Sequence, residues 1–204
     1  MSIPFVPSPN FSSRRGCAVE GVIIHYTASG GTAEGDIAWF LNPASKASAH
    51  FVIARDGATT QLVQLEHAAW HAGASRMRDK NGANLFTIGV ELDNCGLLHR
   101  GDSGKFFWES GSTLCRHVGQ AEEATLDYGD GKRIKGWWEP YAEPQLAAFG
   151  ALLEHLRCTP FASATSDLVG HEEISTPYGR KMDPGPLFPW ERFPRLSARR
   201  TKRA

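Results

Sequence analysis

The residues of this chain best suited to chemistry lie close together in one segment, Val169 to Trp190. It reads V-G-H-E-E-I-S-T-P-Y-G-R-K-M-D-P-G-P-L-F-P-W and carries an imidazole (His171), an ammonium (Lys181) and a carboxylate (Asp183). Its prolines and glycines exclude a long helix, so we expect a shaped loop. Histidine and aspartate are ligands that zinc takes in proteins, and a neighbouring lysine suits a developing negative charge. A proline-rich surface turn is the alternative interpretation of the same residues.

Two further candidates lie on predicted strands. The stretch Gly21–Tyr26 has three consecutive β-branched residues, as expected of a strand buried on both faces, and it ends at His25. The stretch Thr87–Asp93 alternates, which places Glu91 on the same side as Gly89, beside an absent side chain. This indicates a functional carboxylate. A satisfied core histidine and a solvent-facing glutamate are the alternatives.

The elements that must position these residues indicate an α/β fold with a central mixed β-sheet flanked by α-helices. Acidic residues at its start and apolar residues at helical spacing predict one helix, and a proline followed by an apolar face predicts another. A D-G turn between two apolar runs predicts a hairpin, so the sheet contains antiparallel strands. These elements are the helices 32–41 and 144–158 and the hairpin strands 49–54 and 59–63.

Two segments line the expected site or border it. The loop A-W-H-A-G-A-S (69–75) carries Trp70 and His71, and it lines a cleft unless the tryptophan is a plug over the core. From 97 to 138 the sequence shows no clear apolar periodicity, and a structureless loop of that length is unusual in a compact domain. We expect an insertion with short strands or turns, whose aromatic residues pack on the body or form a wall for substrate.

The composition indicates one domain over residues 1–204, with an N-terminal arm (1–17), the insertion (97–138) and a basic tail (197–204). Lys+Arg and Asp+Glu are 22 each, which gives no basic field for nucleic acid. Prolines interrupt the N-terminus where a signal peptide needs an apolar core, and no run reaches membrane-spanning length. We therefore expect synthesis in the cytoplasm without a signal peptide, and no membrane insertion. The four scattered cysteines read as free thiols, with a Cys95–Cys115 bridge as the alternative.

Taken in order, these motifs resemble the zinc-dependent N-acetylmuramoyl-L-alanine amidases, the family that includes cell-wall recycling amidases, phage lysins and peptidoglycan recognition proteins. The matching stretches are I-I-H-Y-T-A, S-A-H-F-V-I-A-R-D-G, W-H-A-G, I-G-V-E-L and G-H-E-E-I followed by G-R-K-M-D-P-G-P. The resemblance extends from Ser8 to Phe193, apart from the insertion, and it implies a peptidoglycan recognition protein-like amidase fold.

The resemblance also implies roles for individual residues. The family's Zn²⁺ ligands fall on His25, His171 and Asp183, its general base on Glu91 and its oxyanion-stabilising lysine on Lys181. Two nitrogens and one carboxylate leave a fourth position open, as in catalytic zinc sites. In the same carry-over, His71 and Trp70 line the substrate groove, and His50 is structural.

The activity that the resemblance implies is zinc-dependent hydrolysis of the amide bond between N-acetylmuramic acid and L-alanine in peptidoglycan, as in a lysin or autolysin acting on the wall after release. One alternative is a cytoplasmic recycling amidase acting on soluble anhydromuropeptides. Another is a noncatalytic peptidoglycan-binding protein on the same fold, but such a protein lacks a ligand and this chain has all three. The expected partner is peptidoglycan or a muropeptide, and we expect a monomer.

Overall fold

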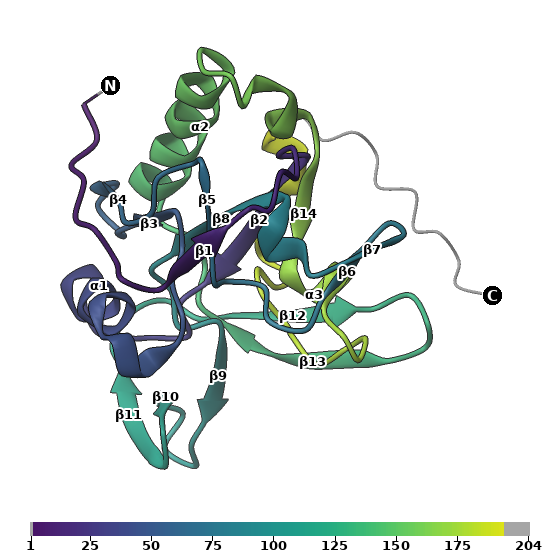
Figure 1. The fold of residues 1–204 in the computed structure, drawn as a ribbon. Coiled ribbons are helices and arrows are strands. Elements are labelled where there is room, and N and C mark those ends of the chain that lie inside the picture. Colours follow the sequence, from purple (N-terminus) through teal and green to yellow (C-terminus); the bar gives the residue numbers. More distant parts are fainter. Residues whose placement is uncertain (1, 194–204) are drawn as a thin grey trace.

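The computed structural model describes residues 2–193 and is built around a five-stranded sheet with the order β14-β2-β8-β3-β4. Its strands are β2 (Gly21–Tyr26), β3 (Phe51–Ile53), β4 (Thr59–Gln61), β8 (Thr87–Leu92) and β14 (Leu168–Gly170). Neighbouring strands are parallel, except that β4 pairs with β3 antiparallel as the predicted hairpin. The sheet is therefore mixed, with helices packed against it (Figure 1), which confirms the predicted fold class.

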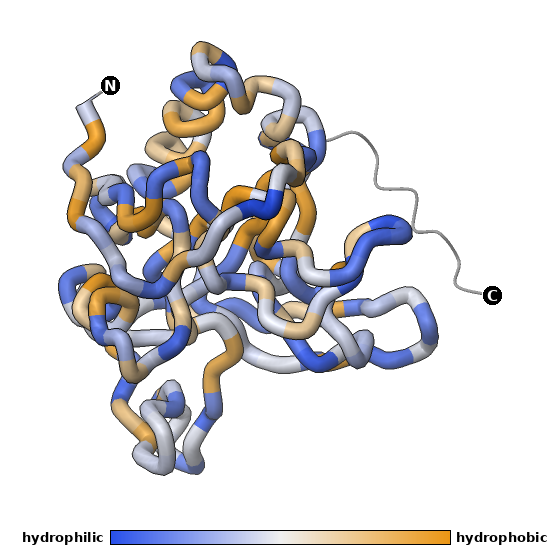
Figure 2. Tube along the Cα trace, viewed as in Figure 1, coloured by the Kyte–Doolittle hydropathy of each residue, from blue (hydrophilic) through white to orange (hydrophobic). Residues whose placement is uncertain are grey.

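One face of this sheet forms the main hydrophobic core. Helix α2 (Glu143–Arg157) covers it and lies within one residue of the predicted helix at each end. Apolar side chains from β2, β3 and β8 meet the inner face of α2, and Figure 2 shows hydrophobic colour concentrated in these elements. Burial of this face fixes which way every strand residue points, because side chains alternate along a strand. The core residues include Val22, Ile24, Phe51, Val90, Leu92, Phe149, Leu152 and Leu156.

The opposite face of the sheet carries the polar candidates. Helix α1 (Ala33–Leu41) packs beside it through Phe40, which joins a small apolar cluster with Val52. His25 and Glu91 lie on this second face, in alternation with the core residues of β2 and β8, and both are buried. A buried ionisable group needs a partner or a function, so we expect the functional site on this second face of the sheet.

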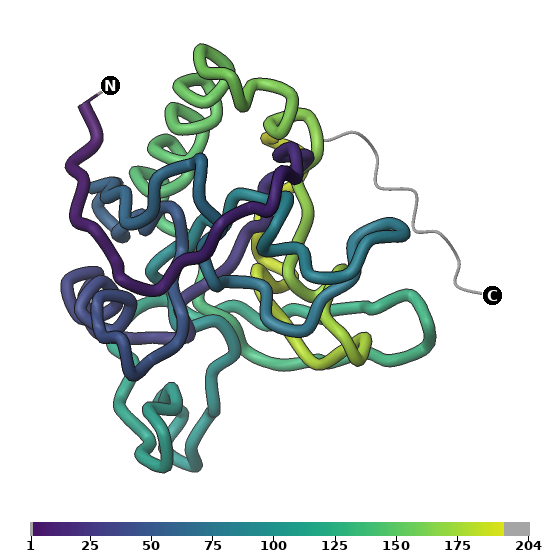
Figure 3. The backbone as a smooth tube through the Cα atoms, in the orientation of Figure 1, coloured from purple at the N-terminus to yellow at the C-terminus, as the bar shows by residue number. Residues whose placement is uncertain are grey.

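The N-terminal arm runs across the molecule (Figure 3) and packs over this second face of the sheet. Its strand β1 (Phe11–Ser13) pairs antiparallel with β5 (His67–Ala69). The Arg14 guanidinium then donates to backbone carbonyls, among them that of Leu65 at 2.8 Å and that of Thr87 at 3.1 Å. The neighbouring His50 accepts the Gly89 N–H at Nδ1, 2.9 Å away, so it is neutral and structural as expected.

The segment from 97 to 138, expected as an insertion with short strands or turns, forms a second antiparallel sheet. Its order is β11-β10-β9-β13-β12, so the first and last strands of the insertion pair at its centre, where it joins the body. Its strands are β9 (Leu97–Arg100), β10 (Phe106–Ser110), β11 (Thr113–His117), β12 (Glu122–Asp127) and β13 (Arg133–Trp138). Within it, Trp138 is fully buried and Trp108 lies over Gly30.

Short elements complete the described chain. They are η1 (Pro43–Ser45), β6 (Arg76–Met77), β7 (Lys80–Asn81), η2 (Ala83–Leu85), η3 (Ala162–Ser166), α3 (His171–Ile174) and η4 (Trp190–Arg192). The basic tail predicted at 197–204 lies outside the described residues. Within residues 2–193, each helix is too short or too polar to cross a bilayer. All four cysteines, which lie in this range, are unpaired.

The buried His50 predicts a pH-dependent stability. Burial, aided by the Arg14 charge, lowers the pKa of His50 to about 3. Below about pH 6.5 the His50 ring binds a proton in the unfolded chain but stays neutral in the folded chain. The free energy of unfolding therefore falls as the pH falls. In urea titrations of metal-free protein between about pH 6 and about pH 4, the wild type should lose about 1.4 kcal/mol per pH unit more than His50→Gln. The exposed His155, replaced by Gln, should keep the wild-type slope, whereas equal slopes in His50→Gln and wild type would refute the assignment.

Candidate metal centre and active site

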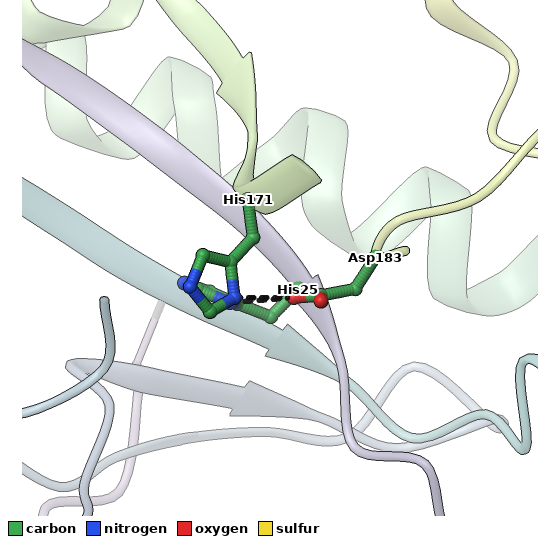
Figure 4. Close-up of side chains that lie close together, drawn as sticks. All are labelled: His25, His171 and Asp183. Atoms are coloured by element: carbon green, nitrogen blue, oxygen red, sulfur yellow. Dashed lines mark hydrogen bonds and ion pairs between the residues drawn. The ribbon is translucent and has the colours of Figure 1, made fainter. Parts of the chain in front are cut away.

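Strand register brings the site residues together. In the parallel ladder between β2 and β8, His25 is the direct partner of Glu91, and both side chains leave the same face. On the other side of β2, Gly170 of β14 pairs with Ile24, so His171, the next residue, lies level with His25. Asp183 returns to this point from the loop that follows α3 (Figure 4). Three segments far apart in sequence thus converge at one end of the central strands.

The three expected ligands meet through single atoms. The Asp183 Oδ2 atom lies 2.8 Å from His25 Nδ1 and 2.9 Å from His171 Nδ1, and the two nitrogens are 3.0 Å apart. All three residues are at most 6% exposed. The described residues therefore hold a compact, buried group of two imidazoles and one carboxylate that is able to bind a metal ion.

The far nitrogen of His171 reveals which tautomer the ring adopts. His171 Nε2 lies 3.1 Å from the Ala72 carbonyl oxygen, which only accepts hydrogen bonds. The proton of the neutral ring is therefore on Nε2, and Nδ1 presents a lone pair to the cluster.

A longer chain of hydrogen bonds fixes the tautomer of His25. The Thr87 hydroxyl donates to the Ala83 carbonyl at 2.7 Å, so at its 3.2 Å contact it accepts from His71 Nε2. His71 Nδ1 then has no proton and accepts from His25 Nε2, 2.9 Å away. The proton of His25 is on Nε2, which leaves its Nδ1 lone pair facing the cluster.

Three lone-pair atoms at these distances repel one another unless a cation lies among them. Burial, with the nearby His171, lowers the pKa of His25 to about 4, so this ring is neutral at neutral pH. Two neutral imidazole nitrogens and one carboxylate oxygen are a donor set that zinc prefers, and at zinc distances of about 2.0 Å tetrahedral ligands lie about 3.3 Å apart. The cluster is slightly tighter than that and fits such an ion after a small expansion.

Glu91 lies beside this cluster with an incompletely bonded carboxyl. It is 8% exposed, and its Oε2 is buried without a hydrogen-bond partner among the described residues. Burial raises the pKa of Glu91 well above its usual value, Asp183 and Asp36 raise it further, and the positive charge of Lys181 opposes them. A buried carboxyl whose pKa is raised in this way is suited to general acid and base chemistry. The positive charge of Lys181 also lowers the pKa of His25, so it acts on both groups.

The two residues expected to line the groove, Trp70 and His71, make other contacts in the structure. Trp70 is half-buried, and its indole Nε1 donates to the Ser12 hydroxyl of the N-terminal arm at 3.3 Å. The His71 ring is buried behind His25 and fills the space above Gly89, where an added Cβ would lie 2.4 Å from the ring. We therefore reassign His71 from lining a groove to orienting His25. Gly89 was the sequence signal for this packing, because its missing side chain makes room for the ring and not for Glu91.

The inserted sheet holds the loop that carries Lys181 and Asp183. The Tyr128 hydroxyl, just after β12, donates to the Lys181 carbonyl at 2.8 Å, and Lys132 Nζ donates to the Gly179 carbonyl at 2.7 Å. On the body side, the Tyr141 hydroxyl donates to the Pro184 carbonyl at 2.7 Å. Nothing in the sequence pattern pointed to these contacts, since each joins a tyrosine or lysine to a backbone atom more than 40 residues away.

Comparison with known proteins agrees with this geometry. Residues 15–186 match the family model described as N-acetylmuramoyl-L-alanine amidase. The chain is 30% identical over 156 residues to the 1,6-anhydro-N-acetylmuramyl-L-alanine amidase AmpD of Escherichia coli K12, which covers 76% of this chain and 61% of that protein. It is 44% identical over 72 residues to N-acetylmuramoyl-L-alanine amidase A of Achromobacter lyticus, covering 35% of this chain and 36% of that protein. The chain thus spans about three fifths of the length of the E. coli AmpD protein and about a third of the length of amidase A.

Solved structures support the same fold. A crystal structure of a selenomethionine derivative of AmpD superimposes with a TM-score of 0.62 at 23% identity, covering 94% of this chain and 92% of that chain. AmiD from E. coli, in complex with the substrate anhydro-N-acetylmuramic acid-L-Ala-D-gamma-Glu-L-Lys, gives a TM-score of 0.60 at 23% identity, covering 92% of this chain and 59% of that chain. At this identity the likeness establishes the fold.

The His71 assignment predicts an effect on metal affinity. Replacing His71 by Phe keeps the ring over Gly89 but removes the partner of His25 Nε2, so the ligand is free to rotate or change tautomer. Loss of such an outer partner typically costs about 10- to 100-fold in metal affinity. Competition with a chromophoric chelator should show that loss for Zn²⁺ in His71→Phe and a smaller one in Thr87→Val, but none in His155→Phe. Unchanged affinity in His71→Phe would mean that the ring only fills space.

Proposed function

The chain belongs to the N-acetylmuramoyl-L-alanine amidase family, and we propose that it hydrolyses the amide bond between N-acetylmuramic acid and L-alanine with Zn²⁺ at His25, His171 and Asp183. One observation carries this proposal. Three buried lone-pair atoms from these residues converge beside Glu91, whose Oε2 has no partner in the described part of the chain. A structural metal site has no use for an adjacent unpartnered carboxyl, whereas a hydrolase needs one to move protons.

A zinc ion held by these three residues would supply Lewis acidity at its open position, polarising the scissile carbonyl. The chain's own groups then account for the remaining steps. Glu91 takes a proton from the attacking water and returns it to the amine of L-alanine as the carbon–nitrogen bond breaks. Lys181 offers a positive charge to the oxygen of the tetrahedral intermediate. His71 and Ala72 hold the two imidazoles in the tautomer that directs their lone pairs inward.

The similarities favour a soluble substrate. AmpD, by its name, is an amidase of 1,6-anhydro-N-acetylmuramyl-L-alanine, and the AmiD structure holds an anhydromuropeptide. We propose that this chain likewise accepts soluble anhydromuropeptides, the alternative that the sequence left open beside a wall-degrading lysin. Polymeric peptidoglycan is the second candidate, because amidase A of A. lyticus, the relative with 44% identity, is named without the anhydro qualifier. A purely binding protein is disfavoured because the ladder holds Glu91 directly beside His25.

Digestion of matched substrates tests both the amidase reaction and the preference for a soluble substrate. An anhydromuramoyl tripeptide and intact peptidoglycan sacculi are incubated with the protein, each with added Zn²⁺ and with chelator, and the products are identified by mass spectrometry. We expect zinc-dependent release of the L-alanine-terminated peptide from the soluble substrate. Release from sacculi instead would assign a wall-degrading amidase, and no cleavage of either substrate would refute the amidase proposal.

The roles of Glu91 and Lys181 predict different effects when each residue is replaced. Glu91→Gln removes the proton carrier and should lower kcat by about 10²–10⁴. Zinc content should remain unchanged, because Glu91 is not a ligand. Lys181→Ala should lower kcat by about 10²–10³, the usual effect of losing one oxyanion donor. The exposed Lys135, which pairs with Glu123 on the inserted sheet, is the matched control, and Lys135→Ala should behave as wild type. Loss of zinc in Glu91→Gln would contradict these roles.

A further inference from the structure

A second group of metal-binding side chains lies where the inserted sheet joins the body. Cys95 is in the connection between β8 and β9, His117 ends β11, and Glu139 follows β13. One ligand atom from each lies within 4.8 Å of the others. Cys95 and Glu139 are buried, at 4% and 9% exposed. The cluster thus combines sulfur, nitrogen and oxygen donors from three separate segments, and the proposed amidase reaction uses none of them.

The spacing of sulfur and nitrogen matches a tetrahedral ion. Cys95 Sγ lies 3.5 Å from His117 Nδ1. Zinc bonds of about 2.3 Å to sulfur and about 2.0 Å to nitrogen, opened to a tetrahedral angle, separate the two ligand atoms by about 3.5 Å. An ion would therefore fit between these two atoms without moving either.

The His117 ring is held in the tautomer that a ligand needs. Its Nε2 lies 2.9 Å from the Gln120 carbonyl oxygen, which fixes the proton on Nε2 and turns the Nδ1 lone pair toward Cys95. The same arrangement orients His171 through Ala72 at the first cluster. A backbone carbonyl behind the ring is a common second partner of metal-bound histidine.

Glu139 is held in place and has room for one more partner. The Arg55 guanidinium donates to both its oxygens, at 2.9 and 3.1 Å, and the Cys95 N–H donates to Oε2 at 2.5 Å. An ionised carboxylate has about four acceptor sites, so one is open. Arg55 also contacts Asp93, so two carboxyl groups share this one guanidinium. A divalent ion that displaces the Cys95 proton adds a net charge of one beside Glu139.

We propose that Cys95, His117 and Glu139 form a second metal site, which binds Zn²⁺ or a similar borderline-soft divalent ion and fastens the inserted sheet to the body. Binding forms a metal–thiolate bond and releases the thiol proton to solvent. The three ligands lie before β9, at the end of β11 and after β13, so one ion ties both ends of the insertion and its outer hairpin. The site does not depend on the proposed amidase function.

Cobalt titration of the full chain, stripped of metal and kept reduced, tests this site directly. The first cluster contains no sulfur, so a near-ultraviolet thiolate-to-cobalt charge-transfer band reports only on a cysteine ligand. We expect two equivalents of Co²⁺ per wild-type chain, with the band. Cys95→Ser should bind one equivalent without the band, and the exposed Cys158→Ser should match wild type.

Two further variants keep the test independent of folding and of the first site. His117→Gln should also lose the second equivalent, which covers the case in which Cys95→Ser does not fold. Asp183→Ala should lose the first equivalent and amidase activity but keep the band, so failure at one site is distinguishable from failure at the other. The proposal is overturned if the wild type shows no band, if the band survives in Cys95→Ser, or if it disappears in Cys115→Ser instead.

Discussion

The site depends on one constraint, namely that three lone-pair atoms are held against one another inside the protein. Left alone, His25, His171 and Asp183 would turn apart or take up protons, because close acceptors without a donor or cation repel. Backbone carbonyl groups prevent both outcomes, because hydrogen bonds that end at them hold the far nitrogen of each histidine ring. The Ala72 carbonyl orients His171, and the Ala83 carbonyl, through Thr87 and His71, orients His25. The backbone thereby dictates the tautomer of both rings and prepares the cluster for a cation before one arrives.

The position of His71 explains why the central sheet has a glycine at its middle. A ring must lie directly behind His25 to reach its Nε2, and any side chain at residue 89 would occupy that space. The Gly89 N–H in turn donates to His50, so the same residue supports two buried histidines. A glycine inside a strand costs stability, so its presence here reflects the close approach of another group.

The sequence was sufficient for the elements with strong periodicity. The β-branched run of β2, the alternation of β8 and the apolar stripe of α2 were each predicted within one or two residues, because burial of one face leaves a regular pattern. Selecting His25 and His171 from eight histidines required the family's motif order, since spacing alone did not distinguish them. For the insertion the sequence predicted short strands or turns but not their pairing into one sheet, because strands such as β10 and β11 contain no fully buried residue and lack an apolar alternation. The cluster of Cys95, His117 and Glu139 left no sequence signal at all, because tertiary folding alone brings those residues together.

Burial and charge act in opposite directions on the pKa of Glu91, the residue proposed to carry protons in the reaction. Burial and the nearby Asp183 favour its neutral form, whereas Lys181 favours its ionised form. In the proposed reaction, a divalent cation at the three-ligand cluster would add to the effect of Lys181 and favour the ionised form of Glu91 that accepts the first proton. As negative charge develops on the substrate oxygen, the balance would move back toward the protonated form that releases it. A carboxyl with both forms accessible can serve in both directions within one turnover, and the strand register that places it beside His25 is what makes this balance available.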